Sequence, residues 1–213
     1  MKKGSLLKIS LVLLCLVQWT AGVFAQPAKH RIIITSPDKN LSVLIDETKD
    51  HSIVYSFSAN GLQLIEPSLF GVNEPGIIEW QSASVKAVNK SWKPVWGKRM
   101  LVPDVYNEGL IDVSLYKIRV RVYNDGFAFR YENANAETER TQFHFSGNYT
   151  AWYYNGENAN IGPEQLEDAE GIRLPVMTIK ADATHYMAVH EAALESGEPL
   201  VLSVSKGTKL FTV

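Results

Sequence analysis

Apolar and polar residues alternate along most of the chain, and short turn signals interrupt the alternation. Between residues 52 and 58 the large apolar side chains occupy every second position, and Asn60-Gly61 then favours a tight type I′ turn into residues 62–65. A period of two places successive side chains on opposite faces of a strand. These residues therefore predict a β-hairpin.

A second hairpin is indicated further along the chain. Residues 118–122 alternate, Asn124-Asp125-Gly126 supplies the turn, and residues 127–131 alternate again. Its arginines, Arg119, Arg121 and Arg130, are expected to form an exposed charged face, and pairing with carboxylates across the sheet is the alternative. The one helical candidate, 163–170, is short. Many short strands with little helix predict one all-β domain, an antiparallel β-sandwich. The further strand candidates are 31–35, 41–46, 83–88, 111–115, 142–145, 176–180, 186–190 and 200–204.

The last six residues, 208–213, also have strand character, and no polar tail follows them. A strand in this position leaves an apolar edge without a partner, and such an edge attracts other strands. We therefore expect a sandwich that is truncated at its C-terminal end, and an isolated chain that aggregates or dimerises.

The N-terminus, residues 1–25, has the order of a secretory signal peptide. Two lysines precede an apolar run from 6 to 17, and Val23 and Ala25 occupy the positions that signal peptidase reads. The run is shorter than the roughly 20 residues of a membrane span. We expect cleavage after Ala25, a periplasmic or secreted location, and a single mature domain of residues 26–213 without a membrane span.

Composition excludes several kinds of chemistry. The only cysteine, Cys15, lies in the predicted signal, so the mature domain has no disulfide and no thiolate site. The formal net charge is −2 and no basic stretch follows the signal, which argues against nucleic acid or an anionic membrane surface as the main partner. His190-Glu191 lacks the second histidine of a zinc-protease helix, because position 194 is leucine.

Ordered motifs at 92–97 (WKPVWG), 106–108 (YNE), 123–131 (YNDGFAFRY) and 190–194 (HEAAL) span most of the mature chain. In order and spacing they resemble the N-terminal domain of glycoside hydrolase family 97, the exported α-glucosidases and α-galactosidases of Bacteroidetes-type bacteria. The resemblance implies a galactose-mutarotase-like β-super-sandwich, followed by a catalytic (β/α)8 barrel and a small C-terminal β domain. The chain would hold most of the first domain only, so no catalytic residue is expected in it.

One residue is expected to serve the active site from this domain. The resemblance implies that Glu191 lends its carboxylate to a calcium ion that barrel glutamates otherwise hold, and that the ion polarises the glycosidic oxygen and assists leaving-group protonation. Calcium takes six to eight oxygen ligands, so Glu191 alone should bind it weakly or not at all. Without the resemblance, Glu191 would be an ordinary exposed acid at a strand end. Val105 and Gly109 depart from the family's histidine and leucine, which leaves substrate preference open.

Adjacent aromatic residues suggest a sugar-binding surface. Three aromatics in a row at 152–154 cannot all point into one core from a strand, so Trp152 and Tyr153 are candidates for stacking on an α-linked oligosaccharide. Trp92 and Trp96 could form a similar platform. For these two tryptophans core packing is the more ordinary role, because large aromatics dominate burial.

The combined prediction is the carbohydrate-binding, active-site-supporting domain of an exported α-glycosidase, inactive alone. Its partners would be an α-linked oligosaccharide and the catalytic barrel. Two alternatives remain: a free-standing exported carbohydrate-binding β-sandwich, and a structural sandwich that mediates protein contacts. The barrel would decide between glucosides and galactosides, and between retention and inversion.

Overall fold

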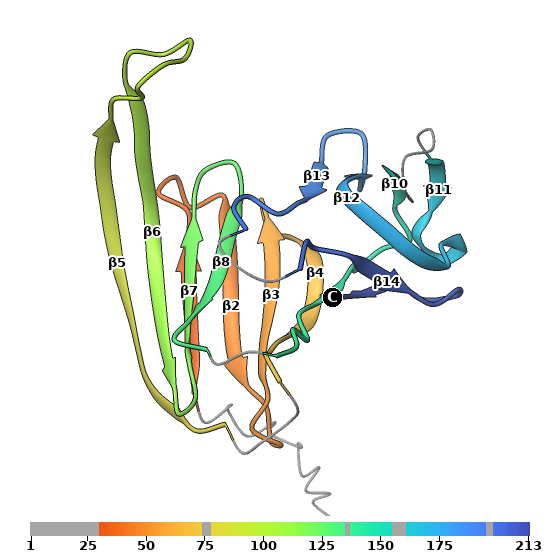
Figure 1. Ribbon diagram of the computed structural model, residues 1–213, viewed down its shortest axis with the longest axis horizontal. Coiled ribbons are helices and arrows are strands. Elements are labelled where there is room, and N and C mark those ends of the chain that lie inside the picture. Colours follow the sequence, from red (N-terminus) through yellow and green to blue (C-terminus); the bar gives the residue numbers. More distant parts are fainter. Residues whose placement is uncertain (1–29, 74–77, 135–136, 155–160, 195–197) are drawn as a thin grey trace, which may run out of the picture.

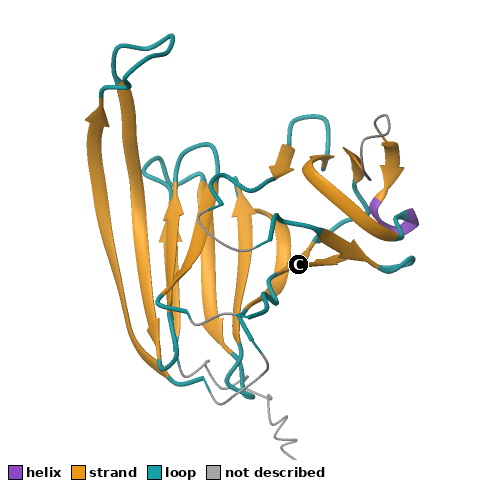
Figure 2. Ribbon diagram, in the orientation of Figure 1, coloured by secondary structure: helices purple, strands orange, loops and turns teal. Residues whose placement is uncertain are grey.

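A computed structural model describes residues 30–73, 78–134, 137–154, 161–194 and 198–213, so the predicted signal peptide lies outside the described residues. The described chain forms three antiparallel sheets (Figure 1, Figure 2), which confirms the all-β prediction. Among these residues no helix is long and apolar enough to cross a membrane.

The first sheet contains β1 (Arg31–Thr35), β2 (Leu41–Glu47), β3 (Ile53–Ala59) and β4 (Leu62–Phe70), in that order. Asn60 and Gly61 join β3 to β4 with φ values of 51° and 80°, the positive pair that a type I′ turn requires. The first predicted hairpin is therefore confirmed.

The second sheet contains β5 (Trp80–Trp92), β6 (Val102–Val113), β7 (Lys117–Val122) and β8 (Phe127–Glu132), again in chain order. The amide of Tyr123 donates to the carbonyl of Gly126 at 2.8 Å and closes the β7–β8 hairpin, which was also predicted. The 111–115 segment proves to be the end of a much longer β6, whose strand stops at Val113.

The third sheet contains seven short strands. β10, β11, β12, β14, β15 and β9 form the path β11-β10-β12-β14-β15-β9, and β13 pairs with β12 beside it. Their bounds are β9 (Gln142–His144), β10 (Thr150–Tyr154), β11 (Ile161–Gln165), β12 (Gly171–Lys180), β13 (Tyr186–Val189), β14 (Leu202–Val204) and β15 (Leu210–Thr212).

The prediction of a helix at 163–170 is wrong for most of these residues. Its first residues belong to β11, which pairs with β10, and only Leu166–Asp168 form a single 3-10 turn. Hydrogen bonding to β10 satisfies the backbone of this segment, so a helix offers it no advantage.

The first two sheets pack face to face, and their inward side chains form the main core. Ile34, Val43, Ile45, Ile118 and Val120 are completely buried. Where the two sheets face each other further along, aromatic rings from both meet in one stacked and tilted cluster of Tyr55, Phe57, Phe70, Phe127 and Phe129. The observed periodicity of burial explains why the sequence alternates.

Gly109 fits this packing by its lack of a side chain. It faces Ile34 of β1, and a Cβ at this position would lie 2.2 Å from the Ile34 Cδ1 atom. A larger residue at this position would displace β1 or the Ile34 side chain. The glycine therefore permits the close approach of the two sheets.

The C-terminal strand corrects one expectation. β15 lies inside the third sheet, where Phe211 is opposite Val204 of β14 on one side and Phe143 of β9 on the other. Phe211 is fully buried and meets Phe145 edge to face at 5.7 Å. The prediction of an unpaired terminal edge is wrong, and with it the reason for expecting this strand to drive aggregation.

Candidate functional site

Glu191 lies just beyond the end of β13, on the third sheet. β13 pairs with β12 from Met177↔Val189 to Lys180↔Tyr186, and the chain leaves the sheet at His190. The Glu191 side chain is exposed, and within the described part of the chain it has no hydrogen bond or ion pair. Its carboxylate is thus free to serve an external group.

The described residues do not complete a metal site around this carboxylate. No group of three or more histidine, cysteine, aspartate or glutamate side chains converges anywhere in the ranges that the structure covers. Calcium prefers six to eight oxygen ligands. A calcium site that used Glu191 would therefore need its other ligands from outside the described residues.

The aromatic residues of β10 divide between two faces, as the strand period requires. Tyr153 points inward, is 1% exposed and packs under the Arg173 guanidinium at 4.5 Å from its ring centroid, so its ring has no free face. Trp152 points outward and is partly exposed, and Tyr154 is 44% exposed. Sugar stacking by Trp152 stays a prediction, and Tyr154 is a further candidate that the sequence did not single out.

Trp152 belongs to a solvent-facing surface that leads toward Glu191. Trp152, Thr178 and Ala188 lie opposite one another across β10, β12 and β13 and therefore share a face. Lys180 and Tyr186 form the next row, with the Lys180 ammonium 5.7 Å from the tyrosine ring centroid. The exposed apolar side chains of the third sheet and its loops are Tyr154, Ile172, Val176, Tyr186, Leu194 and Val201. Of these, Tyr186 lies on β13, and Val176 directly precedes the first β12 residue that pairs with β13, so exposed apolar side chains border the strand that leads to Glu191.

The Tyr-Asn-Glu motif has a structural role in the second sheet. Glu108 is 3% exposed, and its carboxylate accepts from Lys86 Nζ at 2.8 Å, Arg119 Nη1 at 2.5 Å and Arg121 Nε at 2.8 Å. Asn107 points to the other face, where its Nδ2 donates to the Thr35 carbonyl at 2.7 Å. Asn107 therefore links the second sheet to the first, and Glu108 fixes the cations on the outer face of the second sheet.

Arginines of the β7–β8 hairpin pair with carboxylates across the sheet, so the alternative to an exposed charged face is the one that the structure shows. Arg119 also donates to both oxygens of Glu132, at 2.7 and 2.8 Å, and Arg130 lies 2.6 Å from the same carboxylate. Hydrogen bonds from Arg119, opposed by burial and aided by Arg130, lower the pKa of Glu132 to about 2. The network keeps Glu132 ionised well below the pH at which a glutamate is ordinarily protonated.

This pKa predicts a pH dependence of stability. The ordinary glutamate value is 4.5, so the contribution of Glu132 is present above that pH and is lost as the pH falls toward about 2. Urea unfolding at about pH 5 and about pH 3 should show a smaller loss of unfolding free energy in Glu132→Gln than in the unchanged protein. Equal losses in the two proteins would contradict the assignment.

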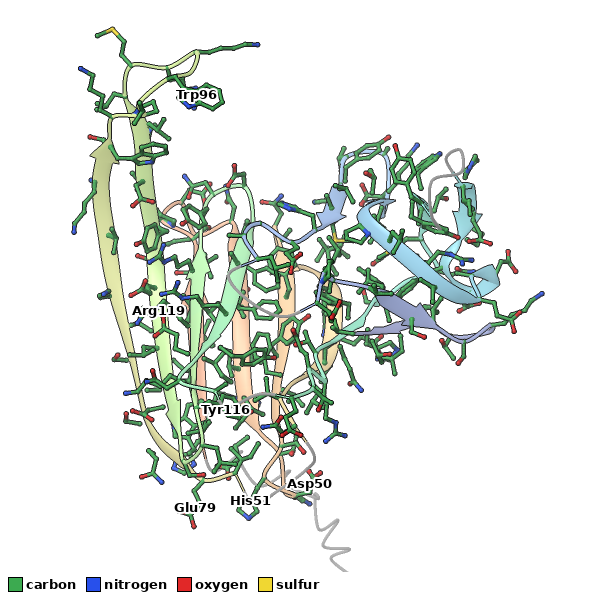
Figure 3. All side chains as sticks on the ribbon, in the orientation of Figure 1. Asp50, His51, Glu79, Trp96, Tyr116 and Arg119 are labelled. Carbon is green, nitrogen blue, oxygen red and sulfur yellow. The ribbon has the colours of Figure 1, made fainter. Side chains whose placement is uncertain are left out.

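Trp92 and Trp96 are not in the core. Both are exposed, on the hairpin formed by β5 and β6, and Figure 3 shows Trp96 at its far end. The expectation of core packing is wrong, because β5 and β6 extend beyond the strands that could cover their tip.

Comparisons with known proteins agree on one family. The family described as Glycosyl-hydrolase 97 N-terminal matches residues 34–210. A retaining alpha-galactosidase of Bacteroides thetaiotaomicron is 22% identical over 229 aligned residues, covering 94% of this chain and 34% of that protein.

Solved structures show the same fold. A glycoside hydrolase family 97 enzyme from Pseudoalteromonas sp. strain K8, in complex with acarbose, aligns with a TM-score of 0.75 and 23% identity, over 85% of this chain and 31% of that one. A beta-arabinopyranosidase aligns with a TM-score of 0.75 and 19% identity, over 85% of this chain and 35% of that one. The chain spans about a third of the length of each relative.

Proposed function

The chain belongs to the Glycosyl-hydrolase 97 N-terminal family, and on that premise we propose that it is the active-site-supporting domain of an exported α-glycosidase. The domain has no catalytic residue of its own in this proposal. It supplies Glu191 to a site that a catalytic barrel completes, and it acts on α-glycosides only together with that barrel.

The proposal rests on the surroundings of the Glu191 carboxylate. The carboxylate is exposed, has no partner among the described residues, and follows a strand bordered by uncovered apolar side chains. Apolar surface of this kind is typical of a contact with another domain or protein. When bound, calcium would supply positive charge at the glycosidic oxygen.

Calcium titration and activity assays test the proposal. The full chain is expected to show no calcium binding in the micromolar range, because one carboxylate cannot replace six to eight ligands. It is also expected to release no nitrophenol from nitrophenyl α-glucoside or α-galactoside. Hydrolysis above the buffer rate, abolished by Glu191→Gln, would contradict the proposal because it would place a complete active site in this chain.

Export is part of the proposal, and it rests on the signal-like residues 1–25. Mass spectrometry of the protein from the producing cells should find Gln26 as its first residue. A protein that retains Met1 and stays in the cytoplasm would contradict export.

A free-standing carbohydrate-binding sandwich is the second candidate, favoured by the outward position of Trp152 beside Tyr154. Relatives have been solved with acarbose and with panose. Titration of the full chain with these two sugars separates the candidates. Binding that Trp152→Ala abolishes and Leu115→Ala preserves would favour this second function, and no heat with either sugar would count against it.

A further inference from the structure

The tip of the β5–β6 hairpin stands apart from the rest of the domain. β6 pairs with β7 only from Asn107 onward, whereas β5 and β6 remain paired out to Trp92↔Val102. The hairpin therefore continues as two strands alone and projects beyond the sandwich (Figure 1). The tip, defined as residues 92–101, has no side-chain hydrogen bond among the described residues and is exposed almost throughout.

Apolar side chains are concentrated at this tip. The exposed fraction is 54% for Trp92, 100% for Val95, 87% for Trp96, 84% for Met100 and 58% for Leu101. Burying a fully exposed aliphatic or aromatic side chain of this size would contribute about 1.5–3 kcal/mol, and burying the two half-exposed ones would contribute less. A group of five in ten residues is typical of a surface that another molecule covers.

The charged residues of the β5–β6 hairpin indicate what kind of surface the partner would need. No aspartate or glutamate occurs between positions 80 and 103, whereas the same stretch carries Lys86, Lys90, Lys93, Lys98 and Arg99. Glu108 holds Lys86, and the other four cations have no ion pair among the described residues. A partner that covers the tip must therefore offer an apolar pocket with carboxylates at its rim.

Two other occupants fit less well. Residues 93–101 contain no side-chain oxygen, so only their backbone carbonyls could accept hydrogen bonds from sugar hydroxyl groups. A second copy binding tip to tip would bring the three cations of each tip together, and like charges in contact oppose association.

We propose that the tip is a docking surface for the polypeptide that family members carry beyond the third matched by this chain. The inference rests on the proposed function and names where its partner binds. This chain spans only 31% to 35% of its relatives' lengths. The tip and β13, which leads to Glu191, both lie in the upper part of Figure 1, the tip at the far left and β13 right of the middle. One globular partner lying along this side would cover the tip and meet Glu191.

The test compares substitutions at the tip in this 213-residue chain with the same substitutions in an intact enzyme of the family. In the full 213-residue chain, Val95→Ser, Trp96→Ser and Met100→Ser together should leave the thermal midpoint within about 2 °C. The matched control replaces three exposed apolar residues elsewhere, Ile33, Leu62 and Leu115, by serine. A large loss of stability caused by the tip variant alone would overturn the proposal, because the tip would then serve its own domain.

The second arm grafts residues 92–101 into the aligned segment of the intact Bacteroides thetaiotaomicron retaining alpha-galactosidase. The graft with three serines should melt at least about 3 °C below the unaltered graft. Reversing the charges of Lys93, Lys98 and Arg99 to glutamate should also lower the midpoint, more at low salt than at high salt. Equal midpoints for the serine and unaltered grafts would overturn the proposal.

Hydrogen exchange gives a measurement that needs no graft. The aligned segment of the unmodified galactosidase should exchange at least about tenfold more slowly than residues 93–101 of this chain alone. Equal exchange would overturn the proposal even if a graft failed to fold. Failure of the proposed function would be seen separately, as calcium binding or hydrolysis by this chain.

Discussion

Replacing Glu108 by glutamine is expected to lower the free energy of unfolding by about 3 kcal/mol. The Glu108 carboxylate is buried and holds Lys86, Arg119 and Arg121 on one face of the second sheet. Glutamine keeps the size of the side chain but removes the charge that balances these cations. Because Lys86 and Arg121 are partly exposed and can recover hydration, the effect falls at the lower end for a broken buried ion pair.

Urea unfolding of Glu108→Gln beside Glu79→Gln measures this effect. Glu79 is exposed and precedes β5, so its substitution should change stability by less than about 0.5 kcal/mol. The urea dependence should be the same in all three proteins, which shows that the folded state and not the compactness of the unfolded chain has changed. A Glu108→Gln protein as stable as the Glu79→Gln control would contradict a supporting role for the motif.

Replacing Phe211 by alanine is expected to destabilise the domain by about 3–4 kcal/mol. The ring is fully buried, two residues before the end of the chain, and it packs against Phe145 in a strand that has a neighbour on both sides. Removing it leaves a cavity and also weakens the contact of β15 with β9 and β14.

Trp96→Ala is the matched control, since it removes a larger aromatic ring that is 87% exposed. That change should alter the unfolding free energy by less than about 0.5 kcal/mol. Differential scanning calorimetry of both variants would show a lower midpoint for Phe211→Ala only. Equal midpoints would mean that the C-terminal strand is not seated in the third sheet.

Local patterns predicted the parts of the fold that depend on local pairing. The alternation at 52–58 and 118–122, with turn residues directly after each, specified both hairpins because neighbouring strands need only the turn between them. The pairing of β15 depends on β9, more than sixty residues earlier, and no local signal encodes that contact. For this reason the terminal strand was wrongly predicted to have no partner.

The sequence also could not specify which side chains of a strand face the core, or which segments other strands cover. A strand at 150–154 allows either Trp152 or Tyr153 to face the core, and the pairing with β12 decides for Tyr153. Aromatic residues such as Trp96 are usually buried, but here the hairpin extends past its neighbouring strands. Glu191 had no physical signal of its own, and it was identified only through the family resemblance of its segment.

The nucleotide sequence that follows the codon for Val213 in the producing organism tests the central claim most directly. The account predicts a continuation, in frame or displaced by a frameshift, that encodes a (β/α)8 barrel with glutamates able to share a calcium ion with Glu191. A stop codon followed by an unrelated gene would contradict it.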